Sequence, residues 1–454
     1  MTQPNELQAA LVRAEQAALA APEDPDAHGR LGTLLIEAAR AALRRGVAGG
    51  EDNSAAAEAL QRRALSHLER AAQLRPGSAQ ALRYAGLAHR ELGDFARAVG
   101  SLQAAAHAAS GDPEIAVELA FAWQCLGDTA AAIREYEAVL ARHPGHANAR
   151  ASFALTLLGA GDYERGWEEY EWRLRLPDTI YRRYPFAFWR GESLRDKRIL
   201  ITSEQGIGDE IMFASCYQEV LERAGDCYIE CSTRLVSLFA RSFPRAKVIA
   251  RNLSRMPDWS SLPRFDFHVP GGSLPRQLRR SEQDFPSRGS YLVADEARVR
   301  HWRKRLEESL GTGKKVGLAW TGGLAETLRS ARSLDFADLQ PVLEVQGARF
   351  VSLEFVDPGP GLPWWPEATR NVDESAALVR ALDLVISVTT TVAHVAGALG
   401  APLWLAIPGA STWRYGWSGE SLPWYGQARI FRGAGDRRQL TQRLAGELRR
   451  WISA

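Results

Sequence analysis

The chain has 454 residues, of which 46% are hydrophobic and 24% are charged, so it has the composition of a folded globular protein and not of a disordered one. At roughly 150 residues per domain, this length suggests about three domains. Lys and Arg number 56 and Asp and Glu number 54, and the net charge of +2 excludes the basic surface typical of nucleic-acid or anionic-membrane binding.

The start of the chain and its cysteines favour a cytoplasmic location. Residues 1–20 contain acidic side chains and no continuous apolar stretch, so they are unlike a signal peptide. Residues 384–413 carry no Asp, Glu, Lys or Arg, but polar residues and prolines interrupt them, and we interpret them as buried strand, helix and strand instead of a membrane span. Four cysteines without a CxxC pair predict neither a disulfide framework nor a zinc site.

A sequence repeat with a spacing of 34 residues occupies the first third of the chain. Gly-Asp pairs begin at Gly93, Gly127 and Gly161, and small or apolar residues recur in the same frame around them. Each unit therefore predicts two helices joined by a turn at the Gly-Asp pair, and Pro76 and Pro144 stand where second helices should end. The pattern resembles the tetratricopeptide repeat.

An earlier unit of the same kind begins near His28. Its two helices are expected to be separated by an insertion of about 20 residues near 38–57, in which 49–54 should form a flexible loop. Since one repeat cannot bury its own apolar face, we expect four to stack into an α-helical solenoid over 1–175. Such a stack would offer a groove for a partner protein, and the alternative is a rigid spacer or a dimerisation arm, which leaves a homo-oligomer open.

Beyond the repeats the sequence changes to an α/β pattern. Residues 176–196 are aromatic and irregular and are expected to form a linker. Strand-like and helical segments then alternate, which predicts parallel sheets with helices on both faces in two Rossmann-like lobes, 197–310 and 311–435. A final helix within 436–454 is expected to pack back across the lobes. The predicted strands are 198–202, 227–231, 246–250, 265–269, 316–320, 350–353, 384–388 and 402–407, and the other predicted helices are 211–223 and 391–399.

A glycine-containing loop follows the first predicted strand. Gly206 and Gly208 would let the backbone approach a ligand and point N–H groups at an anion. A dinucleotide fingerprint would need a third glycine in the region that Glu210 and Ile211 occupy, so a nicotinamide cofactor is not expected. Asp209 lies at the start of the next helix, where it is either an N-terminal cap or a general base at a cleft, and its spacing alone favours the cap.

A second candidate loop lies at the end of the strand at 384–388. Thr390 and Thr391 precede a helix that contains His394, and hydroxyls beside a helix N-terminus suit a diphosphate. The alternative is threonine capping with a buried histidine. Further candidate donor contacts come from Arg332 and Ser333 after the strand at 316–320, and from Trp413 and Arg414 in a late aromatic cluster with Trp424 and Tyr425, which could instead be packed in the core.

Residues from about 167 to 431 resemble the bacterial glycosyltransferases that join tetratricopeptide repeats to a family-9-like GT-B domain, which are distantly related to heptosyltransferases and to the protein O-GlcNAc transferase. The resemblance rests on motifs in a fixed order at 189–192, 204–209, 265–270, 273–275, 316–320, 332–333, 393–400, 413–414 and 423–425. It implies an inverting, metal-independent sugar transfer, with a nucleotide-sugar donor as substrate and no cofactor.

The resemblance also implies roles for single residues. Asp209 maps to the proposed base, His268 is a second candidate on a loop expected to line the cleft, and Glu204 is a third. Thr390, Thr391, His394 and Arg332 map to the segment that holds the donor phosphates. The chain departs from the family at Thr389 and at Thr412, where an Asp is common, and the first change removes a negative charge beside those phosphates.

Three functions follow from this resemblance. The leading hypothesis is a glycosyltransferase that modifies a protein acceptor held by the repeats, such as Ser or Thr residues of flagellin. The second is the same chemistry on a lipopolysaccharide or another glycan, with the repeats used for assembly. The third is a scaffold whose transferase fold binds but does not catalyse.

Overall fold

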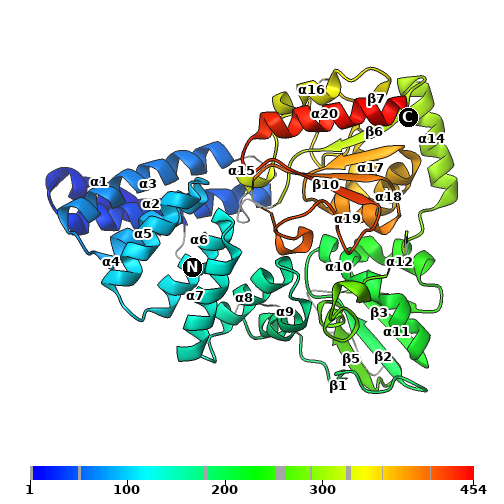
Figure 1. Cartoon of the computed structure of the whole chain (residues 1–454), viewed down its shortest axis with the longest axis horizontal. Helices are drawn as coiled ribbons and strands as arrows, with labels where there is room; N and C mark the ends of the chain where they lie inside the picture. Colours follow the sequence, from blue (N-terminus) through cyan, green and yellow to red (C-terminus); the bar gives the residue numbers. More distant parts are fainter. Residues whose placement is uncertain are drawn as a thin grey trace. The chain divides into compact units, whose positions relative to one another are not determined.

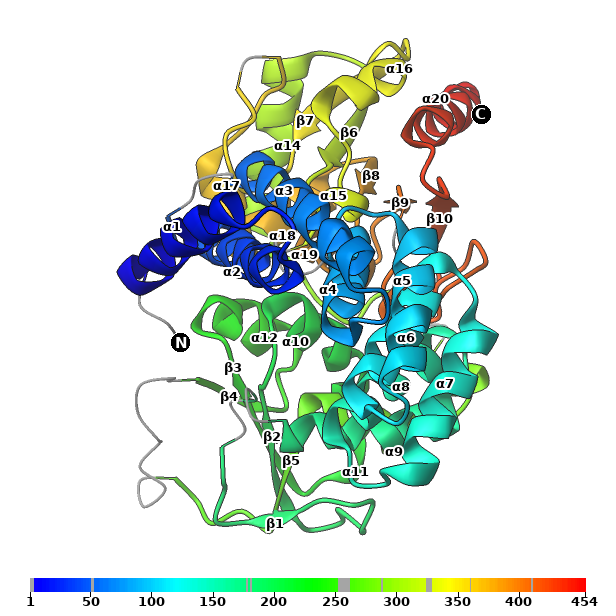
Figure 2. The same cartoon turned by 90° about the vertical axis from the view of Figure 1, so that its left-hand side faces the viewer.

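The chain divides into two units in a computed structural model (Figure 1, Figure 2). The first comprises residues 1–160 with 323–331, and the second comprises 161–322 with 332–454. The structure describes residues 4–49, 53–176, 179, 182–251, 262–286, 289–323, 329–359, 361–409 and 411–454.

The first unit is built from helices that pack against their neighbours in the sequence. Its helices are α1 (Pro4–Ala20), α2 (Pro25–Gly49), α3 (Ser54–Leu74), α4 (Ala79–Glu91), α5 (Phe95–Ala108), α6 (Pro113–Leu126), α7 (Thr129–Arg142) and α8 (Ala147–Gly159). Glycine at the helix contacts explains the close packing, since a Cβ at Gly86 would lie 2.6 Å from Leu102 Cγ. The predicted helical repeat is confirmed.

The turns of the repeat follow the Gly-Asp pairs. Gly93 and Gly127 have φ of +81° and +95°, a conformation that disfavours residues with a Cβ. The aspartates that follow them, Asp94 and Asp128, cap α5 and α7 by accepting the N–H groups of Arg97 and Ala131. The recurring pair thus ends one helix and begins the next.

The insertion in the earliest repeat differs from the expectation. Helix α2 continues to Gly49 and α3 begins at Ser54, so most of 38–57 lengthens the two helices instead of separating them. The alanine-rich sequence explains this, because alanine has the highest helix propensity and Ala39, Leu43 and Ala57 can form a small core of their own. Part of the loop expected at 49–54 lies outside the described residues.

The first lobe of the second unit contains a parallel sheet with the strand order β1-β5-β2-β3-β4. Its strands are β1 (Ala187–Phe188), β2 (Arg198–Thr202), β3 (Asp226–Cys231), β4 (Lys247–Ala250) and β5 (Phe267–Pro270), and its helices are α10 (Ile207–Phe213), α11 (Tyr217–Arg223), α12 (Val236–Ser242) and α13 (Pro275–Leu278). The predicted strands are confirmed. The single helix expected at 211–223 is instead α10 and α11 around a short 3-10 turn, and β1 lies within the expected linker.

The second lobe contains another parallel sheet, with the order β10-β9-β8-β6-β7. Its strands are β6 (Lys314–Ala319), β7 (Ala348–Ser352), β8 (Leu384–Ser387), β9 (Leu403–Ile407) and β10 (Ala428–Arg432). The helices that follow or flank them are α14 (Glu296–Leu310), α16 (Gln340–Leu343), α17 (Pro366–Arg370), α18 (Val372–Ala381), α19 (Thr391–Ala398) and α20 (Arg437–Ser453). The short helix α15 (Arg329–Arg332) falls at the division between the units, with 329–331 in the first unit and Arg332 in the second. Two parallel sheets with helices confirm the expected GT-B-like fold class.

The last helix packs on one sheet. Leu440, Leu444 and Leu448 of α20 are buried in the core of the second lobe, together with Val316 and Leu318 of β6 (Figure 1). The expectation that this helix packs across both lobes is therefore wrong, because its apolar face is buried against the second lobe alone.

The helix that ends the repeat frame belongs to the second unit by its contacts. Helix α9 (Tyr163–Tyr170) and the 3-10 turn η1 (Glu171–Arg175) lie beyond the division at Ala160, earlier than the solenoid end expected at 175. Trp167 is 1% exposed and its Nε1 donates to the carbonyl of Arg279 at 2.8 Å. Trp167 stands where the preceding repeats have Val99 and Ile133, and its larger ring with the hydrogen bond to Arg279 fixes this helix to the α/β module.

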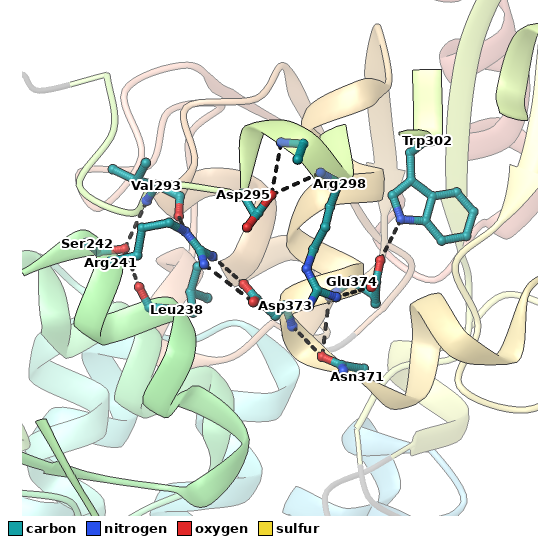
Figure 3. Close-up of polar contacts among 11 residues, drawn as sticks. Leu238, Arg241, Ser242, Val293, Asp295, Arg298, Trp302, Asn371, Asp373 and Glu374 are labelled. Carbon is teal, nitrogen blue, oxygen red and sulfur yellow. Dashed lines mark hydrogen bonds and ion pairs between the residues drawn. The ribbon is translucent and has the colours of Figure 1, made fainter. Parts of the chain in front are cut away.

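A polar network joins the two lobes where the chain passes from one to the other (Figure 3). Arg241 of α12 forms an ion pair with Asp373 of α18, and its Nε donates to the carbonyl of Val293 at 2.8 Å. The N–H of Val293 donates to Ser242 Oγ at 2.9 Å. On the other side, Arg298 of α14 pairs with Glu374 of α18. The connecting segment is therefore held by side chains of both lobes.

Candidate functional site

The two loops singled out in the sequence meet at the carboxyl edges of the two sheets. Helix α10 follows β2 and helix α19 follows β8, and the two helices pack against each other. A Cβ at Gly208 would lie 2.9 Å from His394 Cδ2 and 3.7 Å from Thr391 Oγ1. The absence of a side chain at Gly208 is what lets these two helix starts approach. Asp209 and His394 therefore belong to one region, where ligands of parallel α/β sheets bind.

Asp209 is an ion-pair partner and not a helix cap. The N-cap of α10 is Gly206, and Asp209 lies one turn into the helix start. Its Oδ1 accepts from Arg414 Nε at 2.6 Å and lies 2.5 Å from Arg414 Nη2. The two side chains are 17% and 23% exposed, so the pair is partly exposed. Among the described residues, the second oxygen, Oδ2, has no hydrogen-bond donor.

Arg332 and Ser333 follow the first strand of the second lobe. Arg332 donates to Thr389 Oγ1 at 2.9 Å from Nη2 and at 3.1 Å from Nε, and it also donates to the carbonyl of Thr389. The threonine that replaces the family aspartate thus still accepts from this guanidinium, while burial lowers the pKa of Arg332. Ser333 Oγ accepts the N–H of Gly322 at 2.9 Å, which fixes the loop after β6.

The two threonines at the start of α19 differ in how their hydroxyls are used. Thr390 Oγ1 lies 3.0 Å from Ser387 Oγ, so that hydroxyl is used at the end of β8. Thr391 is the first residue of α19 and is exposed, beside N–H groups that the start of a helix leaves without intrahelical acceptors. The hydroxyl of Thr391 and these N–H groups can receive an anion.

His394 is buried between two tyrosines. The side chain is 5% exposed, its Nδ1 lies 2.8 Å from Tyr425 Oη, and its Nε2 lies 3.0 Å from Tyr415 Oη. Burial lowers the pKa of His394 to about 4, so the ring is neutral at physiological pH. Because both nitrogens have tyrosine partners, the ring has no N–H left for a donor phosphate, and the contact implied by the family resemblance is replaced by an internal one.

The second and third base candidates have structural partners. His268 lies in β5 and not on a loop, is 4% exposed, and its Nδ1 donates to the carbonyls of Phe186 and Ala187 at 3.0 and 3.2 Å. Burial lowers the pKa of this histidine. Glu204 accepts from Arg173 at 2.6 and 3.0 Å and from the N–H of Gly272 at 3.1 Å, which ties η1 to the first lobe. Of the two carboxylates, Asp209 is therefore the more exposed, at 17% against 6% for Glu204.

The aromatic cluster is packed in the core. Trp413 is 6% exposed, and its ring centroid lies 5.7 Å from Trp167 and 5.6 Å from Tyr170. Trp424 is 8% exposed and makes an edge contact with Phe285. The core alternative considered for these tryptophans fits the geometry, and their rings are not presented as a stacking platform. Their packing places Arg414, the residue after Trp413, against Asp209.

Two residues of this region were missed in the sequence. Tyr415 follows Trp413 and Arg414 and could have been included with that motif. Tyr291 lies in the segment that connects the lobes, and no local pattern marks it. It reaches the site only through the fold, where its Oη donates to the carbonyl of Ile211 at 2.9 Å.

Within the part of the chain that the structure describes, no group of three or more His, Cys, Asp or Glu side chains is arranged to hold a metal ion. A search of the same residues for a helix able to cross a bilayer finds none with the required length and apolar character.

No family model matches the chain. The chain is 36% identical over 305 residues to Protein FlbA of Caulobacter vibrioides, which corresponds to 61% of this chain and 50% of FlbA. It thus spans about half the length of the curated relative that it matches.

Two solved structures show a partial likeness to the chain. The structure of Escherichia coli ADP-heptose lipopolysaccharide heptosyltransferase II matches 56% of this chain and 98% of its own, with 16% identity and a TM-score of 0.39. That of a mutant of the Thermobaculum terrenum O-GlcNAc transferase matches 93% of this chain and 94% of its own, with 13% identity and a TM-score of 0.30.

Proposed function

We propose that the chain is a nucleotide-sugar-dependent, inverting glycosyltransferase. The observation that carries the proposal is the meeting of a partly exposed carboxylate, Asp209, with the N-terminus of α19 and two guanidinium groups at the edge of two parallel sheets. A base and a phosphate-binding element in contact are the two parts that sugar transfer from a phosphate leaving group requires. The order of the sequence motifs supports it.

The donor phosphates would bind at the second lobe. The free N–H groups at the start of α19, the Thr391 hydroxyl and the guanidinium of Arg332 offer hydrogen-bond donors and positive charge. Arg414, on the following 3-10 turn η9 (Trp413–Tyr415), would share its charge between Asp209 and the donor. These groups would stabilise the negative charge that develops on the departing phosphate.

The acceptor hydroxyl would then attack the anomeric carbon in line with the leaving phosphate. Asp209 Oδ2 would take the proton of that hydroxyl, since Oδ1 is held by Arg414. A single displacement of this kind inverts the anomeric centre. Each of these groups comes from this chain, and the step as proposed is independent of a metal.

The acceptor would be a protein bound by the helical repeats, with Ser or Thr residues of flagellin as the first candidates. The support is the repeat architecture of the first unit, which offers an extended surface for a peptide. A glycan acceptor would use the same chemistry without requiring this surface.

The proposal is tested by co-expressing the full chain with a flagellin and a donor pathway and weighing the flagellin by mass spectrometry. We expect a mass increase of whole sugar units with the wild-type chain and none with Asp209→Asn. Purified wild-type chain that neither transfers nor hydrolyses any of a panel of nucleotide sugars would contradict the proposal and favour a binding scaffold.

A further inference from the structure

The end of helix α9 contacts both segments that carry the Asp209–Arg414 pair. Gln205 Nε2, in the loop that leads into α10, donates to Tyr170 Oη at 2.8 Å. The ring of Tyr170 packs against Trp413, the residue before Arg414, with ring centroids 5.6 Å apart. Tyr170 is 4% exposed, and burial raises the pKa of its hydroxyl to about 12, so the hydroxyl keeps its proton at neutral pH. One buried side chain thus links a loop of the first lobe to a turn of the second.

The turn η1, which continues α9, holds the same loop at a second point. Arg173 donates to both carboxylate oxygens of Glu204, at 2.6 and 3.0 Å, and its guanidinium lies over the ring of the neighbouring tyrosine at 4.3 Å. Glu204 and Gln205 stand directly before Gly206, the N-cap of α10. The start of the helix that carries Asp209 is therefore held by side chains of α9 and η1.

Arg173 departs from the repeat pattern at a buried position. Ala105 and Val139 stand 68 and 34 residues earlier, at the same place in the two preceding repeats, and both are fully buried. Arg173 is 7% exposed, so a charged side chain has replaced an apolar one in the interior. A buried ion pair is often no more stabilising than apolar packing of similar size, because both charges lose their hydration. The pair with Glu204 is better explained by the geometry that it gives to the loop.

We propose that Tyr170 and Arg173 are positioning residues: they hold the loop 204–206 and the turn η9 in place and thereby set the geometry of the Asp209–Arg414 pair. The two members of this pair lie in different lobes and are 205 residues apart in the chain, so their alignment depends on long-range contacts. Helix α9 and η1 supply such contacts to both segments. The kinetic consequence rests on the proposed function, whereas the geometric one does not.

The geometric consequence is tested first, by NMR of the full chain labelled with 15N in arginine. The Nε–H signal of Arg414, which donates to Asp209 Oδ1, is identified by its loss in Arg414→Lys. We expect this signal to shift in Tyr170→Phe, which removes only the hydroxyl that holds Gln205, and to stay unchanged in the control Tyr228→Phe, a buried tyrosine of β3. An unchanged Arg414 signal in Tyr170→Phe would overturn the inference whether or not the chain transfers sugar.

The kinetic consequence is tested by comparing kcat with the donor KM. We expect kcat to fall about tenfold in Tyr170→Phe and about 10²-fold in Tyr170→Leu, which also removes the ring packed on Trp413. The donor KM should change less than about twofold, because small displacements of reacting groups slow chemistry without removing a donor contact. Tyr228→Phe, whose hydroxyl accepts from Lys247 at 3.1 Å, should retain wild-type kcat. Should Tyr170→Leu not fold, Tyr170→Phe decides the result.

A conservative change at the second residue tests the same role. Arg173→Lys keeps a positive charge beside Glu204 but cannot bond both carboxylate oxygens in the planar geometry of a guanidinium, so it should also lower kcat more than the donor KM. Wild-type kcat in Tyr170→Phe, or a raised donor KM with unchanged kcat, would overturn the inference. A wild-type chain without any transfer would count against the proposed function alone, since the NMR result would still decide whether Tyr170 sets the geometry of the pair.

Discussion

The edges of the two lobes use similar sequence patterns for different purposes. At the first, a glycine-containing turn leads into α10 and presents Asp209, whose side chain is 17% exposed and has one oxygen open. At the second, a threonine-rich turn leads into α19, but its histidine is 5% exposed and both ring nitrogens are hydrogen-bonded internally. The difference shows that exposure and unused hydrogen-bonding capacity separate a group that can act on a substrate from one that shapes the site.

The largest effect is expected at the exposed member of this comparison. Asp209→Asn keeps the size of the side chain and an oxygen for Arg414 but removes the base, so the transfer rate should fall about 10³-fold. Single-turnover transfer measures this fall, and equilibrium binding of the donor should change little. The matched control is Asp226→Asn, which removes another ion-paired carboxylate of the first lobe, at 3.0 Å from Arg198 Nε. An equal fall in the transfer rate of the two variants would mean that Asp209 acts no differently from another ion-paired carboxylate.

The buried residue of this comparison, His394, should make the stability of the chain depend on pH. Burial lowers the pKa of His394 to about 4 from 6.5, while Asp209 opposes the shift and Arg414 and Arg332 add to it. Between these values the unfolded chain binds a proton that the folded chain does not, so stability should fall as the pH falls from about 6.5 to about 4. The loss attributable to this histidine is about 3 kcal/mol.

Urea unfolding at several pH values measures this dependence. The slope of the unfolding free energy against pH should be positive in this range and smaller in His394→Gln than in the wild-type chain. Equal slopes in the two proteins would mean that His394 is as easily protonated in the folded chain as in the unfolded one, contrary to the effect expected from the burial of its ring.

The sequence predicts those features of this region whose contacts lie between residues close together in the chain. The strand β2 was predicted because Ile199, Leu200 and Ile201 form a local apolar run, whereas β1 has two residues and depends on pairing with the distant β5. Likewise a buried His394 was one alternative in the sequence, but its tyrosine partners lie 21 and 31 residues away. Local patterns locate such elements, and long-range contacts decide what their side chains do.

The same reasoning explains the boundary between the two units. A 34-residue frame assigns the helix after Gly161 to the repeats, and the frame is correct as far as the helix itself is concerned. Its membership is decided by Trp167, whose hydrogen-bond partner Arg279 is 112 residues away. The period contains no information about that contact, so only the structure could place α9 with the α/β module.

The contact between the two edges can be broken without touching a polar group. In Gly208→Ala the new Cβ would lie 2.9 Å from His394 Cδ2, so α10 and α19 must move apart, at a cost of about 2 kcal/mol in unfolding free energy. In the control Gly206→Ala, the nearest atom to the new Cβ is Asp209 Oδ2 at 3.8 Å, an ordinary contact. Urea unfolding should separate the two variants, and equal stability would mean that the helix starts are less tightly apposed.

The smallest effect on stability is expected in the polar network around Arg241, which joins the two lobes at a distance from the sheet edges. Arg241→Gln removes the charge that pairs with Asp373 and weakens the bond to the Val293 carbonyl (Figure 3). The Asp373 side chain, which is 11% exposed, is then left without its ion-pair partner. This should cost about 1 kcal/mol, between the values of exposed and fully buried pairs. Lys304→Gln is the control, since its pair with Glu308 at 3.7 Å is 78% and 64% exposed and should contribute almost nothing. A loss confined to stability, with unchanged transfer kinetics, would show that the edges are aligned by their own contacts; a loss of kcat in Arg241→Gln would mean that their alignment also depends on how the lobes are joined.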